Sequence, residues 1–207
     1  SAEVEQALEA EGITVERLSG KSKFETAVAI AHEVAPDGAA EAVVVNGNHF
    51  ADALSVASYA GDKGMPILLT TPTNLPAATA KAIDDLGVES TVVVGGTAAV
   101  SADVAAKLPN PERVSGKTKY QTSVEIAKHF NEGATHFYVA TGNHFADALS
   151  GAALAAKEST GILLVGKSVH ADLATFIEDE GVETLTILGG KNAVSVEVAN
   201  HLASLLK

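Results

Sequence analysis

The stretch Gly47-Asn48-His49-Phe50-Ala51-Asp52-Ala53-Leu54-Ser55 decides the fold of this chain, because the same nine residues return at positions 142–150. Nine consecutive identities, 95 positions apart (142 − 47), indicate an internal duplication. An apolar run precedes each copy, at 42–45 and 137–140, and an alanine-rich helical pattern follows each copy. Each copy is therefore predicted to form a turn that leads from a buried strand into a helix.

Around this turn, each copy contains three short apolar runs that alternate with helical patterns. The runs are continuous rather than alternating in polarity, which is typical of strands covered by helices on both faces. Strand–helix alternation favours parallel sheets with right-handed crossovers. The sequence therefore predicts an α/β chain of two tandem repeats, each a small parallel sheet covered by helices. The predicted units are a preceding segment at 1–12, a first repeat at 13–108 and a second repeat at 109–207.

The first eleven residues read as an acidic helix that ends at Gly12. Ser1-Ala2-Glu3-Val4 is similar to the segments that begin at Ser101 and Ser195, which open the last helix of each repeat. We therefore expect residues 1–12 to be the closing helix of an earlier repeat, with an ordinary N-terminal helix as the alternative. Its apolar face (Val4, Ala7, Leu8) then needs a neighbour, so self-association or a third repeat is expected.

Composition excludes several classes of function. The 207 residues carry a formal net charge of −12, which argues against binding to nucleic acid or to an anionic membrane. The chain has no cysteine, so disulfides, thiol catalysis and cysteine-ligated metals are excluded. No apolar run approaches the roughly 18 residues that membrane insertion requires. The seven histidines show no metal-ligand spacing, and no metal site is predicted.

Three motifs of catalytic or cofactor-binding proteins can be rejected. Gly20-Lys21-Ser22 and Gly116-Lys117-Thr118 resemble the end of a phosphate-binding P-loop, but the first glycine of that motif is missing in both copies. A nucleophile elbow (G-x-S-x-G) and a dinucleotide fingerprint (G-x-G-x-x-G) are also missing. The sequence therefore predicts neither an enzyme nor a cofactor.

Three turns of each repeat are expected at the carboxyl edge of its sheet, where ligands of open α/β sheets bind. Their glycines can present backbone N–H groups to an anion at a helix N-terminus; the alternative is that they only form tight turns. Asp52 and Asp147 follow His49 and His144 by three residues and favour helix capping over acid–base chemistry. The candidate ligand residues in these turns are Asn48, His49, Gly95, Gly96, Asn143, His144, Gly189, Gly190 and Lys191.

Basic residues gather in two places. Arg17, Lys21 and Lys23 return as Arg113, Lys117 and Lys119, and these six account for nearly half of the 14 basic residues. In so acidic a chain, this clustering indicates two local cationic spots. Solubilising surface or pairing with the many carboxylates is the alternative, and we include all six among the candidate ligand residues.

Taken together, four motifs closely resemble the type 2 cell wall binding repeat of Gram-positive surface proteins. They are Arg17-Leu18-Ser19-Gly20 with Lys23-Phe24, the nine-residue stretch, Pro66-Ile67-Leu68-Leu69-Thr70 and Val93-Val94-Gly95-Gly96, and the second copy matches the same pattern. The resemblance implies Rossmann-like repeats, usually in threes, that anchor secreted proteins to the cell surface. It also associates Arg17, Arg113 and two apolar triplets (Ile67, Leu68, Leu69 and Ile162, Leu163, Leu164) with polymer binding.

Two functional hypotheses follow. The first is a non-catalytic module that binds an anionic cell wall polymer or peptidoglycan without a covalent bond. The alternative is an enzyme or receptor for a small anionic metabolite, such as a sugar phosphate or a nucleotide, at the carboxyl edge of the sheets.

Overall fold

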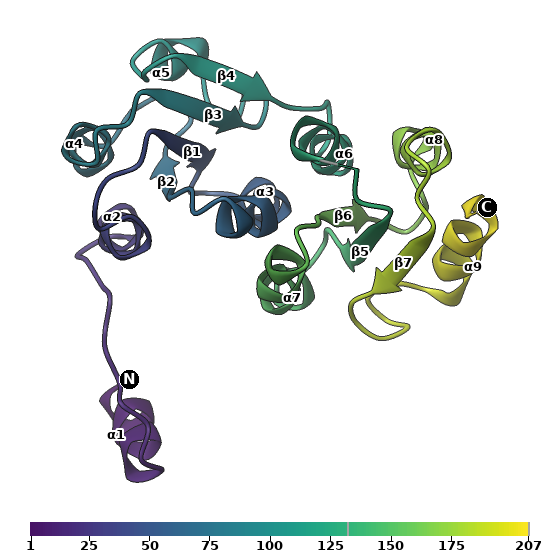
Figure 1. The fold of residues 1–207 in the computed structure, drawn as a ribbon, viewed down its shortest axis with the longest axis horizontal. Coiled ribbons are helices and arrows are strands. Elements are labelled where there is room, and N and C mark those ends of the chain that lie inside the picture. Colours follow the sequence, from purple (N-terminus) through teal and green to yellow (C-terminus); the bar gives the residue numbers. More distant parts are fainter. Residues whose placement is uncertain (132, 207) are drawn as a thin grey trace.

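The structure, a computed structural model, describes residues 1–131 and 133–206. Two parallel sheets form its framework (Figure 1). Sheet A has the strand order β2-β1-β3-β4 and consists of β1 (Glu41–Asn46), β2 (Ile67–Thr70), β3 (Ser90–Val94) and β4 (Pro111–Val114). Sheet B has the order β6-β5-β7 and consists of β5 (His136–Thr141), β6 (Ile162–Val165) and β7 (Thr184–Ile187). All of these pairings are parallel, which confirms the predicted α/β fold.

Helices cover both sheets. The helices that precede or belong to the first repeat are α1 (Ala2–Ala10), α2 (Lys23–Val34), α3 (Phe50–Asp62), α4 (Ala77–Asp85) and α5 (Ala102–Ala105). Those of the second repeat are α6 (Lys119–Phe130), α7 (Ala146–Lys157), α8 (Ala171–Asp179) and α9 (Val196–Leu205). The helix α5 has four residues, and after it a left-handed Asn110 (φ 35°) between Pro109 and Pro111 leads the chain into β4. Within the described residues, none of the helices has the length and apolar character that a membrane span requires.

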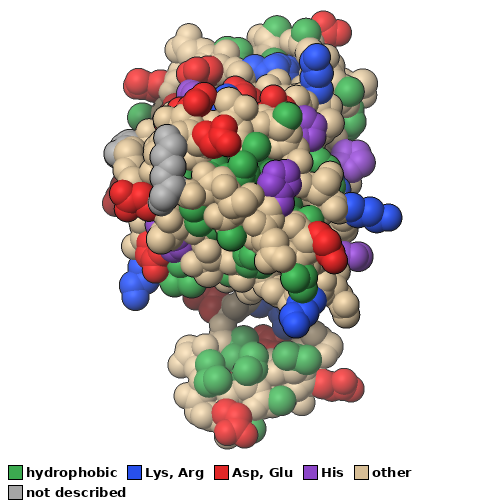
Figure 2. All heavy atoms as spheres, turned by 90° about the vertical axis from the view of Figure 1, so that its right-hand side faces the viewer, with side chains coloured by type: hydrophobic (Ala, Val, Ile, Leu, Met, Phe, Trp, Pro, Cys, Tyr) green, Lys and Arg blue, Asp and Glu red, His purple; other side chains and the backbone are tan. Residues whose placement is uncertain are grey.

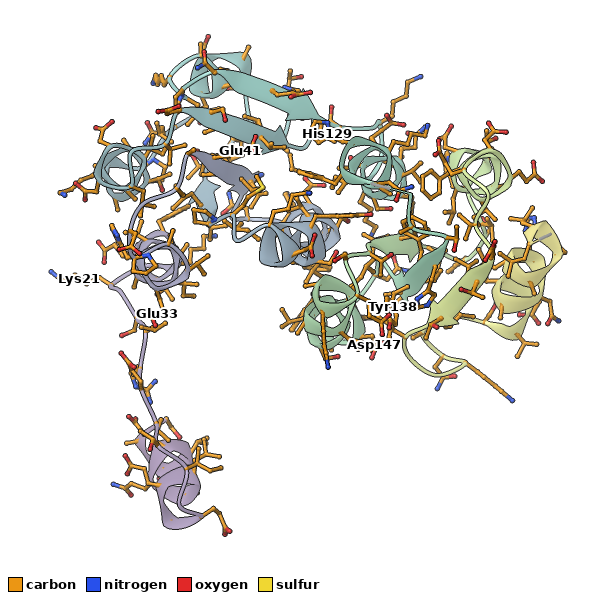
Figure 3. The ribbon with its side chains drawn as sticks, viewed as in Figure 1. Lys21, Glu33, Glu41, His129, Tyr138 and Asp147 are labelled. Atoms are coloured by element: carbon orange, nitrogen blue, oxygen red, sulfur yellow. The ribbon has the colours of Figure 1, made fainter. Side chains whose placement is uncertain are left out.

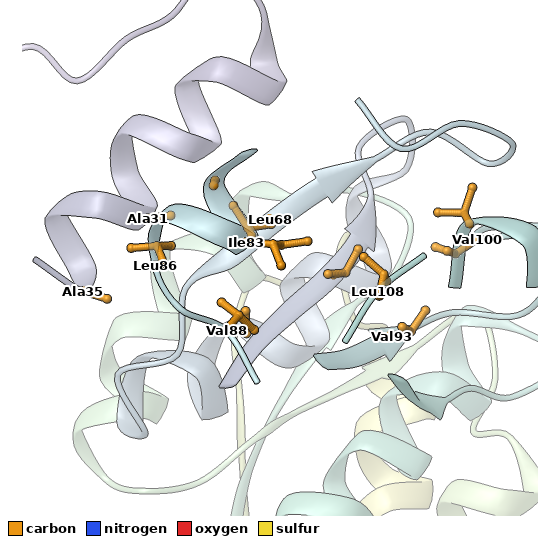
Figure 4. Close-up of a cluster of buried hydrophobic side chains, with 13 residues drawn as sticks. Ala31, Ala35, Leu68, Ile83, Leu86, Val88, Val93, Val100 and Leu108 are labelled. Atoms are coloured by element: carbon orange, nitrogen blue, oxygen red, sulfur yellow. The ribbon is translucent and has the colours of Figure 1, made fainter. Parts of the chain in front are cut away.

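Each repeat has its own core. In the first repeat, Leu68 of β2 and Val93 of β3 pack against Ile83 of α4 and Leu108 beyond α5 (Figure 4). In the second repeat, Phe137 of β5 meets Phe176 of α8 edge to face, with their ring centroids 5.3 Å apart. Burial on both faces explains why the strand sequences are continuously apolar.

Two further clusters join the repeats to each other. In one, Val45 of β1 packs with Ile126 of α6; in the other, Leu54 of α3 packs with Tyr138 of β5. Tyr59 of α3 also stacks on a ring of α6, Phe130, at 5.4 Å. The helix α3 thus lies between the two sheets and belongs to the packing of both.

The strand β4 departs from the expected organisation. The internal repeat of the sequence predicts that the second repeat begins at residue 109, just before this strand. In the structure, β4 pairs with β3 and completes sheet A, and Arg113 lies in register with Val93. The matching segment of the first repeat, Val15 to Leu18, forms no strand in the described part of the chain. The first strand of the second sequence repeat therefore belongs to the sheet of the first repeat.

The helix predicted at the N-terminus is present as α1, and Gly12 follows it with a φ of +79°. The helix stands apart from the body of the molecule and forms a separate lobe in Figure 2. None of its residues is buried, and Val4 is 58% exposed. Ser1 caps it as Ser101 and Ser195 cap α5 and α9, but its role as the closing helix of an earlier repeat stays a prediction.

Candidate functional site

The candidate site lies at the carboxyl edge of sheet A, where the two repeats meet. Three loops enclose a pocket of about 420 Å³: the β1–α3 turn around His49, the β3–α5 loop around Gly96 and the β4–α6 loop around Lys117. The first two loops come from the first repeat, and the third comes from the second repeat. We call this hollow the junction pocket; its lining includes His49, Phe50, Asp52, Ala98, Lys117 and Thr118.

Two helices begin at the junction pocket. The helix α3 has His49 at its N-cap without a side-chain hydrogen bond to the first turn. The helix α6 begins at Thr118, whose Oγ1 accepts a hydrogen bond from the N–H of Gln121 at 3.2 Å. The first turn of a helix carries unpaired N–H groups and the positive end of the helix dipole. Two such termini at one pocket favour an anionic group there.

Asp52 is the acidic group of the pocket. Burial raises the pKa of its carboxyl group, and the neighbouring His49 lowers it to a smaller extent. The β3–α5 loop comes close to this carboxyl because residue 95 is glycine: a Cβ on Gly95 would lie 2.6 Å from Asp52 Oδ2. The left-handed φ of Gly95, +105°, also favours glycine. Asp52 is therefore an acidic side chain that the two helix N-termini and Lys117 share a pocket with.

An exposed aromatic pair lies beside the pocket. The rings of Phe50 and Phe145, one from each copy of the nine-residue stretch, are 5.8 Å apart and meet edge to face. Both are exposed, and Phe50 also lines the junction pocket. We did not single them out in the sequence, although their presence in both copies of the stretch was an available signal.

Two of the predicted basic residues hold the turns in place. Lys23 Nζ donates to Gly47 O at 2.8 Å and to Asn48 Oδ1 at 2.7 Å. In the second repeat, Lys119 Nζ donates to Gly142 O at 2.5 Å and to Asn143 Oδ1 at 3.3 Å. Both ammonium groups therefore stabilise the strand-to-helix turn of their own repeat.

The two arginines differ from each other. Arg113 donates from Nη1 to Gly95 O at 2.6 Å and from Nη2 to Val100 O at 2.8 Å, and burial lowers its pKa. Arg17 forms an exposed ion pair with Glu5 of α1. Each guanidinium group thus has partners within the chain.

The ammonium groups of the three remaining candidate lysines, Lys21, Lys117 and Lys191, have no hydrogen-bond or ion-pair partner among the described residues. Lys21 points away from the body (Figure 3), while Lys117, at the matching position of the second repeat, lines the junction pocket. Lys191 is exposed on the loop after β7. Of the six clustered cations, Lys117 is thus the one that combines a free ammonium group with the pocket.

The apolar triplets associated with binding belong to the sheets. Leu68, Ile162, Leu163 and Leu164 are buried, and Ile67 and Leu69 are half-buried. Buried side chains offer a polymer no surface, so we assign the four buried residues to the core. Their position in short strands covered by helices explains the burial.

The second repeat has turns that match the first two loops of the junction pocket, but it has no counterpart of the β4–α6 loop in the described chain. The candidate residues of these turns lie at the carboxyl edge of sheet B, and all four are exposed: Asn143, His144, Gly189 and Gly190. In the described chain, no loop occupies the place that the β4–α6 loop takes at sheet A. The structure therefore brings His49 and Gly96 of the first repeat together with Lys117. It leaves Asn143, His144, Gly189 and Gly190 of the second repeat on an open edge. No cluster of three or more histidine or acidic residues suited to a metal occurs among the described residues.

Comparison with known proteins identifies the family and relatives of the chain. The family model described as "Cell wall binding domain 2 (CWB2)" matches residues 17–105 and 113–199. The N-acetylmuramoyl-L-alanine amidase LytC of Bacillus subtilis (strain 168) is 37% identical over 192 residues, which are 92% of this chain and 38% of that protein. The amidase enhancer of the same organism is 33% identical over 207 residues, which are 98% of this chain and 28% of that protein.

Two solved structures have the same fold. Cwp6 from Clostridium difficile superposes with a TM-score of 0.86 at 26% identity, over 91% of this chain and 31% of that one. Cwp8 from the same organism superposes with a TM-score of 0.83 at 33% identity, over 99% of this chain and 36% of that one. The chain thus spans about a third of the length of these relatives. Because the family model covers both repeats, the chain belongs to the cell wall binding domain 2 family.

Proposed function

We propose that this wall-binding chain is non-catalytic and holds a secreted protein, without a covalent bond, to an anionic secondary polymer of the cell wall. The observation that carries the proposal is the junction pocket, where the N-termini of α3 and α6 meet beside the free ammonium group of Lys117. Family membership places the chain at the cell wall or cell surface, as the resemblance implied. The identity of the polymer and the contact residues are part of the proposal.

The pocket suits an acidic substituent on a sugar chain. Phosphate and carboxylate groups accept hydrogen bonds from helix N-termini and lysine. The exposed rings of Phe50 and Phe145 offer an apolar surface against which the C–H face of a sugar ring can pack. His49 lines the pocket, and the exposed Asn48 precedes it on the same turn. Because the net charge of the chain is −12, a polyanion gains only from such local contacts.

A small anionic metabolite is the second candidate ligand. The observation in its favour is the size of the junction pocket, about 420 Å³, which falls within the range of small-molecule sites. A thermal-shift screen with nucleotides and sugar phosphates tests it. A saturable rise in melting temperature with one compound, and not with matched salt, would favour this reading over wall binding.

The main test is a pull-down of the chain with purified wall sacculi, before and after acid extraction of secondary polymers. Lys117→Gln is expected to weaken binding by roughly two- to fivefold, the effect of one exposed charge contact. Lys21→Gln removes the same charge at the matching position outside the pocket and serves as the control. Equal binding to extracted sacculi would assign the ligand to peptidoglycan, and no binding to either would refute wall binding by this chain.

We also propose that a further repeat of the same kind, in a second copy of this chain, covers the outer face of α7. That face exposes Leu149 and Leu154, which match the buried Leu54 and Tyr59 of α3. Since α3 is buried by the neighbouring repeat, the same face of α7 fits the same kind of neighbour. Light scattering over a concentration series tests this; a strict monomer at all concentrations contradicts it. A chain beginning at Ile13 shows whether α1 takes part.

A further inference from the structure

We propose that Arg113 is a positioning residue: it holds the Gly95–Val100 loop of the first repeat in the shape that the junction pocket requires, and it does not touch the ligand. The inference rests on the proposed function of that pocket. It also changes the role that the sequence resemblance gives to this arginine, from a contact with the polymer to a contact with the chain.

Arg113 joins the two ends of the Gly95–Val100 loop through two hydrogen bonds, which we call the bracket. Its backbone lies on β4, opposite Val93, and its side chain reaches past the end of β3. The two terminal nitrogens donate to the carbonyl oxygens at the two ends of the loop, Gly95 at 2.6 Å and Val100 at 2.8 Å. A planar guanidinium group presents its donors from separate nitrogens in a rigid fork, whereas an ammonium group presents all of them from one nitrogen on a flexible stem.

The loop that Arg113 brackets forms one wall of the pocket. Gly96, Ala98 and Ala99 line the junction pocket. Within the loop, the N–H groups of Ala99 and Val100 donate to Gly96 O at 2.8 and 3.0 Å. The C=O and N–H of a trans peptide point in opposite directions, so the contact with Gly95 O turns the N–H of Gly96 away from Arg113. Arg113 thus sets the orientation of a backbone donor in the pocket wall.

The surroundings of Arg113 disfavour a direct contact with an anion. The hollow in which its side chain lies is also lined by two carboxylates, Glu125 and Asp172. An anion placed there would face both carboxylates, while the guanidinium group already donates to two carbonyl oxygens. The free ammonium group of Lys117 lies on the loop between this hollow and the junction pocket. The charge that meets the ligand is therefore that of Lys117, and the charge of Arg113 is directed at the backbone.

The experiment compares Arg113→Lys, Arg113→Met and Lys117→Met with the unchanged chain. Affinity for polymer-bearing sacculi is measured over a series of salt concentrations, below the melting temperature of every variant. Both Arg113 variants are expected to lower the affinity by about tenfold. The slope of log affinity against log salt should stay unchanged in them, because no ligand contact is lost. Lys117→Met is expected to flatten that slope by about one, as the loss of one ion contact with a polyanion does.

Three results would overturn the proposal. Full affinity in Arg113→Lys would mean that charge alone suffices, and a flattened slope in Arg113→Met would make Arg113 a ligand contact. Unchanged affinity in folded Arg113→Met would reduce its role to stability.

Amide hydrogen exchange separates the failure of this proposal from the failure of the proposed function. In Arg113→Lys, exchange at residues 96–100 should accelerate while the amides of β1 and β3 stay protected. Faster exchange together with no effect of Lys117→Met on binding would leave the bracket intact and refute the pocket as the ligand site. Unchanged exchange would refute the bracket itself.

Discussion

The same nine-residue stretch leads into both α3 and α7, yet the two helices lie in different environments. Leu54 of α3 is 6% exposed, whereas its counterpart in α7, Leu149, is 56% exposed. Five residues further on, Tyr59 is 3% exposed and the matching Leu154 is 44% exposed. The identical sequence fixes the turn and the helix in both places, and the presence of a neighbouring repeat decides whether the outer face is core or surface.

The third strand of each repeat carries the same contrast. In sheet A, β3 is covered along its outer edge by β4, and its residues from Thr91 to Val94 are buried. In sheet B, β7 has no strand on that edge in the described chain, and its residues are exposed or half-buried. Arg113 and Arg17 occupy the same position of the repeated motif, but their partners differ. Arg113 donates to the backbone beyond β3, and Arg17 pairs with Glu5 of α1. Pairs of matching substitutions can therefore test how much of each repeat depends on its neighbour.

The largest difference is expected for leucine at the two matching helix positions. Leu54→Ala should lower the free energy of unfolding by about 2–5 kcal/mol, because it leaves a cavity between the repeats. Leu149→Ala should change it by less than about 0.5 kcal/mol, since that side chain is exposed in the monomer. Urea unfolding at a concentration where the chain is monomeric measures both. Equal losses would mean that the two helices are buried alike in solution.

A smaller difference is expected for the two arginines. Arg113→Met removes charge-assisted hydrogen bonds to two carbonyl oxygens and should cost about 1.5–3 kcal/mol. Arg17→Met removes an ion pair at the surface, and we expect the midpoint of its urea transition to coincide with that of the parent. A destabilised Arg17→Met chain would show that the segment before α2 is packed more firmly than the structure indicates.

The smallest effect concerns the carboxyl group in the junction pocket. The pKa of Asp52 is raised by burial, so the folded state favours its protonated form. This stability is fully present below the pKa of an unfolded aspartate, 3.8, and is lost as the pH rises through the folded pKa. Asp52→Asn should therefore be more stable than the parent at neutral pH, and the advantage should vanish in acid. Melting temperatures between pH 3 and pH 7 test this; an advantage that does not change with pH would contradict the burial of the charge.

The sequence was sufficient for the regular elements, because their signals are local. Apolar runs such as residues 42–45 and helix-opening residues such as Ser101 depend on the neighbouring residues alone. The pairing of β4 with β3 was not visible, since a segment of four residues with a leading proline carries little strand signal and its partner lies some 20 residues away. The duplicated motif itself suggested that Pro111 opens a new unit.

The candidate site was predictable in place but not in detail. Parallel strands bring their carboxyl ends to one edge, so His49 and Gly96 were expected near each other, and both line the junction pocket. What a cation contacts depends on three-dimensional reach: Lys23 and Lys119 bind the turn carbonyls of their own repeats, and Arg113 binds the loop before it. Charge clustering in the sequence could not separate these three from Lys117.

The placement of β4 has a mechanical consequence. The four residues of β4 are the last strand of sheet A, and only Ser115 to Thr118 separate them from α6, so the repeats are joined without a slack linker. When the two ends of the chain are pulled apart, tension passes along β4, parallel to β3, and strains their hydrogen bonds together in shear rather than one after another. The bracket from Arg113 to Gly95 and Val100 adds two more bonds across the same seam. A pulling force on the second repeat therefore acts directly on sheet A of the first repeat.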